Sequence, residues 1–268
     1  MEKLLHTFEG PTCVSVWLRA MEYLLSVETS TNIILGIGNP VYLSPTEFRI
    51  QAHVNAFLNR HNALPITTVA NTIFPASEYL HGGAQEVYEE FPKTFDQLRG
   101  GSWGTYAMRL LTKSLPVKNS TALQSPLQQL VAKMRRQRET TKMRSIYEVS
   151  LLEDEELLAD IPTYRASSDS RYIRGGPCLS HLSFKLLPNV GVSLTAIYRY
   201  HYYVQRALGN LFGLAQLLAF VASEVGVPVG PLVCHSTYAA IDTEGGWTAS
   251  EVGQLVVECK KLSVEQVA

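Results

Sequence analysis

The residue in this chain with the clearest potential for covalent chemistry is Cys178. It follows Pro177 at the start of an apolar, strand-like run, and His181 lies three positions further on. A cysteine attacks as its thiolate, which nearby cations stabilise. Three arginines precede it in the sequence: Arg165, Arg171 and Arg174. The pattern predicts a nucleophilic thiol. The alternative is a small buried strand residue, because free cysteines are among the most buried residues.

A tyrosine-rich segment and an apolar helix follow this cysteine. Residues 198–203 read YRYHYY, and residues 208–216 read LGNLFGLAQ. The first segment alternates as a strand does, and the second opens a long apolar helix. The tyrosine-rich segment is equally consistent with a ligand-binding role and with a structural role, as a half-exposed amphipathic strand or a subunit interface.

The order of these features resembles the core of the thymidylate synthase superfamily. In that family a cysteine after proline begins a strand, a second polar strand follows, and an LG-x-x-F turn leads into a buried helix. The resemblance covers roughly residues 100–242, and Phe184 and Phe212 keep the family's spacing. The family's cysteine thiolate adds to C6 of a pyrimidine nucleotide, which makes C5 nucleophilic.

The resemblance implies catalytic roles for three residues. Cys178 would be the nucleophile. Leu179 stands where the family has a histidine, so His181 is the substitute for it. Residues 101–109 resemble the family's G-x-x-YG-x-x-W-R segment, with Trp103 at the tyrosine that assists proton removal. Indole cannot do this, so Tyr106 is the expected proton-transfer residue.

The resemblance also implies a set of substrate-binding residues. Arg109 and Arg144 match family arginines, the second of which reaches across a dimer to the partner's phosphate. Tyrosines occupy the family's other phosphate-binding positions, so Arg199 is expected to supply charge there. Gln205 stands at a family aspartate, and Gly213 replaces the asparagine that reads the base. The complete expected set is Arg109, Arg144, Arg199, Gln205, Asn210 and Tyr238.

These features imply a one-carbon transferase that delivers a methyl or hydroxymethyl group to C5 of a pyrimidine nucleotide or nucleoside. The altered positions favour a substrate other than dUMP. A reduced folate, methylenetetrahydrofolate, is the implied cofactor, and a homodimer is the implied assembly. Two alternatives stay open. In the first, the chain keeps the thymidylate synthase-like fold but serves as a binding or interaction protein. In the second, the chain is an unrelated α+β hydrolase or transferase with a Cys178–His181 pair.

Composition narrows the class of protein. The chain has 268 residues, 46% hydrophobic and 18% charged, with a net charge of −1. Such a charge favours neither nucleic acid nor an anionic membrane as a partner. The four cysteines are scattered without metal-ligand spacing, which argues against zinc and disulfides and favours a reducing cytoplasm. The N-terminus lacks the pattern of a signal peptide.

Periodicity predicts one α+β domain over residues 1–268, in which a mixed sheet packs against a long buried helix. Residues 44–59 are ambiguous between helix and strand. The predicted helices are Val14–Val27, Ser125–Arg138 and Leu208–Val225, and residues 252–260 form a short helix or strand. Ser125 is the expected N-cap of the second helix, with Pro126 at its first helical position. The predicted strands are Thr31–Val41, Met143–Leu152, Leu179–Leu187, Val192–Val204 and Leu232–Ile241.

Overall fold

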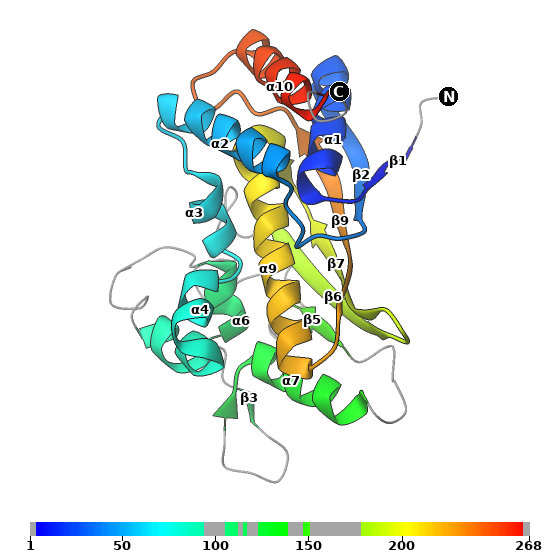
Figure 1. The fold of residues 1–268 in the computed structure, drawn as a ribbon, viewed down its shortest axis with the longest axis vertical. Helices are drawn as coiled ribbons and strands as arrows, with labels where there is room; N and C mark the ends of the chain where they lie inside the picture. Colours follow the sequence, from blue (N-terminus) through cyan, green and yellow to red (C-terminus); the bar gives the residue numbers. More distant parts are fainter. Residues whose placement is uncertain are drawn as a thin grey trace, which may run out of the picture. The chain divides into compact units, whose positions relative to one another are not determined.

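The computed structural model describes residues 4–93, 105–111, 115–116, 123–138, 147–150 and 178–264. This part of the chain has a mixed α+β structure (Figure 1), as the sequence predicts. The order along the seven-stranded sheet is β1-β2-β9-β7-β6-β5, with β8 paired to β9. Parallel and antiparallel neighbours both occur, so the sheet is mixed.

Contacts divide the chain into two compact units, which are described separately. Unit 1 comprises Met1–Ala70, Ile197–Ala215 and Pro231–Ala268, and unit 2 comprises Asn71–Ala196 and Gln216–Gly230. Strand β7 (Gly191–Tyr198), helix α9 (Leu208–Val225) and strand β9 (Val229–Ala240) run through both. The prediction of a single domain stays a prediction.

Unit 1 is organised around three strands and the helix α1. Strand β1 is parallel to β2, and β2 is antiparallel to β9. Alternate residues of β2 and β9, such as Ile33, Leu35 and Cys234, are fully buried. Helix α1 contacts β1 and β2 and buries Trp17 and Met21 completely. The bounds are β1 His6–Gly10, α1 Cys13–Val27, β2 Thr29–Ile37, α2 Pro45–Arg60, α3 Ile66–Asn71, β8 His201–Tyr202 and α10 Ala249–Val264.

A capping box decides the state of the ambiguous segment 44–59. The Ser44 hydroxyl accepts the Glu47 backbone N–H at 3.2 Å, and the Glu47 carboxylate accepts the Ser44 N–H at 2.9 Å. Pro45 occupies the first turn of the helix. This reciprocal arrangement satisfies backbone donors that the first turn leaves without partners, so the segment starts a helix rather than a strand.

Unit 2 contains Cys178 together with several short helices and strands. Strand β5 (Glu148–Ser150) is antiparallel to β6 (Leu179–Leu187), which has the predicted bounds. Helix α7 (Pro126–Gln137) begins after Ser125, whose side chain caps it as predicted. The other elements are α4 Ala76–Gln85, a π-helix Glu86–Glu90, α6 Tyr106–Leu111, β3 Leu115–Pro116 and β4 Leu123–Gln124.

The predicted strand Val192–Val204 is wrong at its C-terminal end. Strand β7 stops at Tyr198, and residues 201–202 form β8, which pairs with β9 in parallel. A π-helix, Tyr203–Ala207, then leads into α9. The tyrosines favour strand structure by propensity, but the buried side chains of His201 and Tyr203 find their partners only when the chain turns here.

Helix α9 has the predicted bounds, and its residues Tyr203–Val225, counted with the preceding π-helix, are long and apolar enough to cross a membrane. Among the described residues, this is the one helix that meets both criteria. In its most apolar 18-residue stretch, 72% is buried in the protein. Burial of this extent is expected of a core helix, and one such helix is weak evidence for a membrane span.

Gly209 lets α9 approach α3 closely. A Cβ at this position would lie 2.6 Å from Val69 Cβ and 2.9 Å from the Ile66 carbonyl oxygen. Backbone atoms cannot move as a flexible side chain can, so Gly209→Ala should destabilise the protein by about 1–3 kcal/mol. Urea unfolding measures the change.

Gly253 in α10 is the matched control, because a Cβ there meets nothing within 4 Å. Gly253→Ala should stabilise the protein by about 0.5–1 kcal/mol through helix propensity alone. Equal effects of the two substitutions would contradict the close packing of α9 on α3.

Candidate functional site

The structure brings Cys178 and Tyr106 together in unit 2. Cys178 is half-buried and lies immediately before β6. The Tyr106 hydroxyl oxygen accepts the backbone N–H of Cys178 at 3.0 Å and that of Leu179 at 3.2 Å. Tyr106 is 8% exposed, so these bonds satisfy its oxygen inside the protein and fix the start of β6 against α6.

The surroundings of Tyr106 keep its hydroxyl protonated. Burial, and to a smaller extent the neighbouring Cys178, raise the pKa of Tyr106 to about 12, although the backbone hydrogen bonds and the Arg109 guanidinium oppose the shift. A tyrosine oxygen that accepts two N–H groups retains its O–H as a donor. At neutral pH the group is therefore a hydrogen-bond donor rather than a general base.

Arg109 completes this cluster. It lies on α6, one turn beyond Tyr106, and is only 5% exposed. Its charge acts on the Tyr106 hydroxyl. A cation stabilises a nearby thiolate, and it equally stabilises a bound anionic ligand. Cys178, Tyr106 and Arg109, all predicted as site residues, thus form one cluster that carries a thiol, a hydroxyl group and a cation.

The other cysteines have different environments. Cys13 and Cys234 are completely buried, and burial raises the pKa of the Cys234 thiol to about 12 and that of Cys13 higher still. Burial likewise raises the pKa of Cys259 to about 12. These thiols are inert structural residues at neutral pH, and Cys178 is the half-buried cysteine of the chain.

The partner of His181 in the structure is Glu148. Its Nε2 lies 2.9 Å from the Glu148 carboxylate on β5, which also binds Ser183 and Lys185. Side chains 181, 183 and 185 share one face of β6 because strand side chains alternate. Partial burial raises the pKa of Glu148, but hydrogen bonds from Lys185, His181 and Ser183 outweigh this and lower it overall.

Asn210, an expected substrate-binding residue, belongs to a buried network in unit 1. Its amide donates to His201 Nε2 at 3.0 Å, and His201 Nδ1 lies 2.9 Å from Ser236 Oγ. The Tyr203 hydroxyl is 3.2 Å from the same oxygen. The Tyr198 ring stacks on His201 at 4.1 Å. No spacing rule joins His201 to Asn210 and Ser236, so the sequence did not identify this network.

Gln205 is also engaged within unit 1. Its side chain hydrogen-bonds the buried Asp242, whose carboxylate accepts the Val204 backbone N–H at 2.9 Å. Burial raises the pKa of Asp242, and these hydrogen bonds oppose the shift. Asp242 holds the π-helix ahead of α9, a tertiary role that the sequence pattern did not reveal.

Two more of the expected binding residues, Arg199 and Tyr238, each have contacts of their own. The Arg199 backbone carbonyl accepts the Thr237 hydroxyl at 2.9 Å, and its side chain is half-buried. Tyr238 stacks on Tyr200, with ring centroids 5.0 Å apart. Arg144 lies outside the described residues, as does Trp103.

Over the described ranges, no group of three or more His, Cys, Asp and Glu side chains is arranged to hold a metal ion. Comparison with protein-family models finds no match for this chain, and comparison with curated proteins finds none either.

The contrast among cysteines predicts selective labelling. Native protein treated with iodoacetamide should be alkylated at Cys178, because the other thiols are buried and have raised pKa values. Peptide mass spectrometry identifies the modified site. Cys178→Ser should abolish native labelling, and urea should expose the remaining thiols. Native labelling at Cys13 or Cys234 would contradict the described packing.

The buried imidazole of His201 predicts a pH dependence of stability. Burial lowers its pKa from 6.5 to about 3. As the pH falls, the ring therefore takes up a proton in the unfolded chain before it does so in the folded protein. The stability contributed by neutral His201 is complete above pH 6.5 and is lost as pH falls towards 3. Between pH 6 and 4, wild type should lose about 1.4 kcal/mol per pH unit more than His201→Gln.

Urea unfolding of both proteins across this pH range measures the difference. NMR of the His201 ring provides a second measurement that does not require the variant to fold. Its chemical shifts should stay constant down to pH 4.5. A midpoint near 6.5 would show that the ring is hydrated rather than buried.

Proposed function

We propose that this protein is an enzyme that activates C5 of a pyrimidine nucleotide or nucleoside, other than dUMP, for one-carbon transfer. The observation that carries the proposal is the cluster of Cys178, Tyr106 and Arg109. It combines the one half-buried thiol of the chain with a fixed hydroxyl donor and a buried cation. The resemblance of residues 100–242 to the thymidylate synthase superfamily supports the substrate class.

In the proposed reaction, the Cys178 thiolate adds to C6 of the pyrimidine. The C5–C6 electron pair moves towards the C4 substituent, and C5 becomes nucleophilic. In the simplest cycle, C5 takes a proton from water and loses its original proton. The Sγ–C6 bond then breaks and restores the ring double bond. This exchange balances without a one-carbon donor.

The residues around Cys178 have distinct parts in this cycle. The Tyr106 hydroxyl, with its raised pKa, donates a hydrogen bond to negative charge that develops near the thiol. The Arg109 guanidinium favours the thiolate or an anionic group of the substrate. Methylenetetrahydrofolate stays an implied donor with no identified site, so no step is assigned to it. A homodimer and a cytoplasmic location are further proposals that rest on the resemblance and on composition.

A second candidate function is a repurposed binding or interaction protein with the same fold. The observation in its favour is that several expected site residues have internal partners. Asn210 binds His201, Gln205 binds Asp242, and His181 binds Glu148. A substrate would have to displace these hydrogen bonds, which costs free energy when the partners are buried.

Release of tritium from C5-tritiated uridine and cytidine nucleotides and deoxynucleotides separates the two functions. Wild type should release tritium to water with at least one of them, and Cys178→Ala should release none, because C5 activation requires the covalent bond to C6. Tyr106→Phe should slow release about 10²-fold through loss of the hydroxyl donor.

His181→Asn is the matched control, because His181 pairs with Glu148 rather than with the cluster. Its release should equal that of wild type. A loss as large as that of Cys178→Ala would favour the Cys178–His181 pair of an unrelated enzyme. No release from any nucleotide by folded wild type would overturn the enzyme proposal and favour a binding protein.

A further inference from the structure

Helix α6 is too short to hold its own position. It has six residues, Tyr106–Leu111, and all of them are buried. Isolated helices of this length do not form in water, because the first turn fixes several residues for a single hydrogen bond. The place of Tyr106 and Arg109 in the Cys178 cluster must therefore be set by contacts that the helix makes with other parts of the chain.

Thr105 makes such contacts at the start of the helix. Its carbonyl accepts the Arg109 N–H at 3.2 Å, which is the first bond of the helix, and its hydroxyl accepts the Met108 N–H at 3.3 Å. The Ala107 N–H donates to the Thr72 carbonyl at 2.9 Å. The first turn leaves the N–H groups of Ala107 and Met108 without partners inside the helix, so Thr105 acts as the N-cap residue.

Water has little access to this cap. Thr105 is 6% exposed, and Met108 is 1% exposed. Without the Thr105 hydroxyl, the Met108 N–H would lie inside the protein with no acceptor, which costs free energy. The first turn of α6 would reduce this cost by shifting or opening.

Two residues of the cluster extend from this part of the helix. Tyr106 directly follows Thr105, and Arg109 lies three positions beyond Tyr106, on the same side of the helix. Tyrosine has two side-chain torsions, so its hydroxyl moves with its backbone. That hydroxyl accepts the N–H groups of Cys178 and Leu179. A shift at Thr105 would therefore reach the segment that carries the thiol, and all these residues belong to unit 2.

We propose that Thr105 is a positioning residue of the Cys178 cluster. Its cap fixes the first turn of α6, so that Tyr106 and Arg109 stay beside the cysteine. This role rests on the proposed function, in which the Cys178 thiolate is the nucleophile. Thr105 acts through Tyr106 and Arg109 and does not itself contact the substrate.

The pH dependence of Cys178 alkylation tests this role without a substrate. Iodoacetamide reacts with the thiolate, so the rate rises with pH and reaches a plateau. The midpoint of the rise reports the charges around the thiol, and the height of the plateau reports access to it. Peptide mass spectrometry after timed quenching measures both quantities for Cys178 in the whole protein.

Three substitutions at Thr105 separate the hydroxyl from the rest of the side chain. Thr105→Val keeps the size but removes the hydroxyl, and the midpoint should rise by about half a pH unit or more, because a cation stabilises the thiolate only while it stays nearby. Thr105→Ser keeps the hydroxyl and should have the wild-type midpoint. If Thr105→Val does not fold, Thr105→Gly should raise the midpoint in the same way, since glycine at an N-cap costs little stability.

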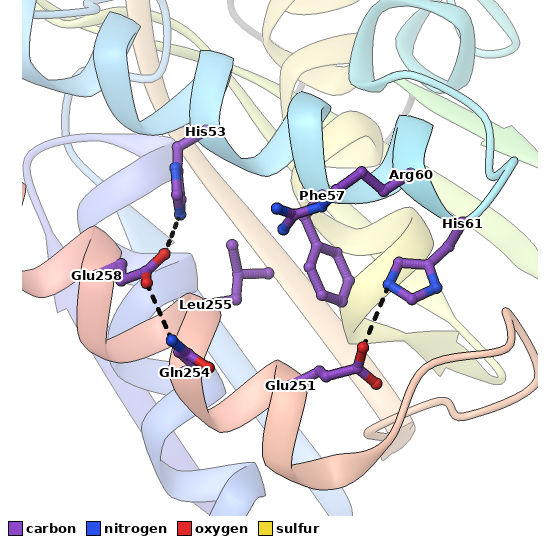
Figure 2. A pocket seen from close by; sticks show the side chains of 8 residues that line it. All are labelled: His53, Phe57, Arg60, His61, Glu251, Gln254, Leu255 and Glu258. Carbon is purple, nitrogen blue, oxygen red and sulfur yellow. Dashed lines mark hydrogen bonds and ion pairs between the residues drawn. The ribbon is translucent and has the colours of Figure 1, made fainter.

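Thr248 is the matched control, because it has the same position before α10 in unit 1. Its hydroxyl accepts the Glu251 N–H at 3.2 Å, and its carbonyl accepts the Val252 N–H at 3.1 Å. Glu251 lines a pocket between α2 and α10 (Figure 2), and no residue of this pocket belongs to the Cys178 cluster. Thr248→Val should therefore lower the stability of the protein and leave the Cys178 midpoint unchanged.

A wild-type midpoint in folded Thr105→Val, or in Thr105→Gly, would overturn the proposal. An equal rise in Thr248→Val would also overturn it, because the effect would then follow from a general loss of stability. A higher plateau with an unchanged midpoint would show only a more accessible thiol and would count against the proposal too. Alkylation needs no nucleotide, so these results are independent of tritium release, and a failure of the proposed function is detected separately.

Discussion

Unit 1 depends on the requirement that a buried imidazole have a partner at each ring nitrogen. His201 is 1% exposed, and its nitrogens contact Asn210 on α9 and Ser236 on β9. A buried polar group without such partners costs about 1–3 kcal/mol. Tyr203 joins the same serine through its hydroxyl, and its backbone carbonyl accepts the Trp17 indole N–H at 2.9 Å. One polar network thus sets how α1, β9 and the start of α9 meet.

The same requirement gives structural roles to residues that the resemblance predicts as binding residues. Asn210 donates to the buried His201 within unit 1. Gln205 lies beside the buried Asp242, and its side chain lowers the pKa of that carboxyl group, which burial raises. A side chain that completes a buried network is constrained as strictly as one that contacts a ligand. Cys178 differs, because it is half-buried and the groups beside it include a cation and a fixed hydroxyl.

Local sequence signals predicted much of the fold. The spacing of apolar residues predicted the bounds of α9 and β6. Ser125 and Pro126 predicted the start of α7. The signal for α2 was also present, in the capping box of Ser44 and Glu47, but periodicity alone left the segment ambiguous. The end of β7 was not predictable, because it depends on where His201 finds partners distant in sequence.

Part of the candidate site was predictable from the order of residues. The resemblance predicts Tyr106 and Cys178 as site residues, and a hydrogen bond joins the two in the structure. His181 has a partner, Glu148, that no spacing rule identifies. The structure also refines the chemistry of Tyr106. A hydroxyl with a pKa of about 12 that already accepts two N–H groups is poorly suited to remove a proton at neutral pH. In the proposed cycle it stabilises developing charge, so loss of the C5 proton requires a different base, and water is the simplest one.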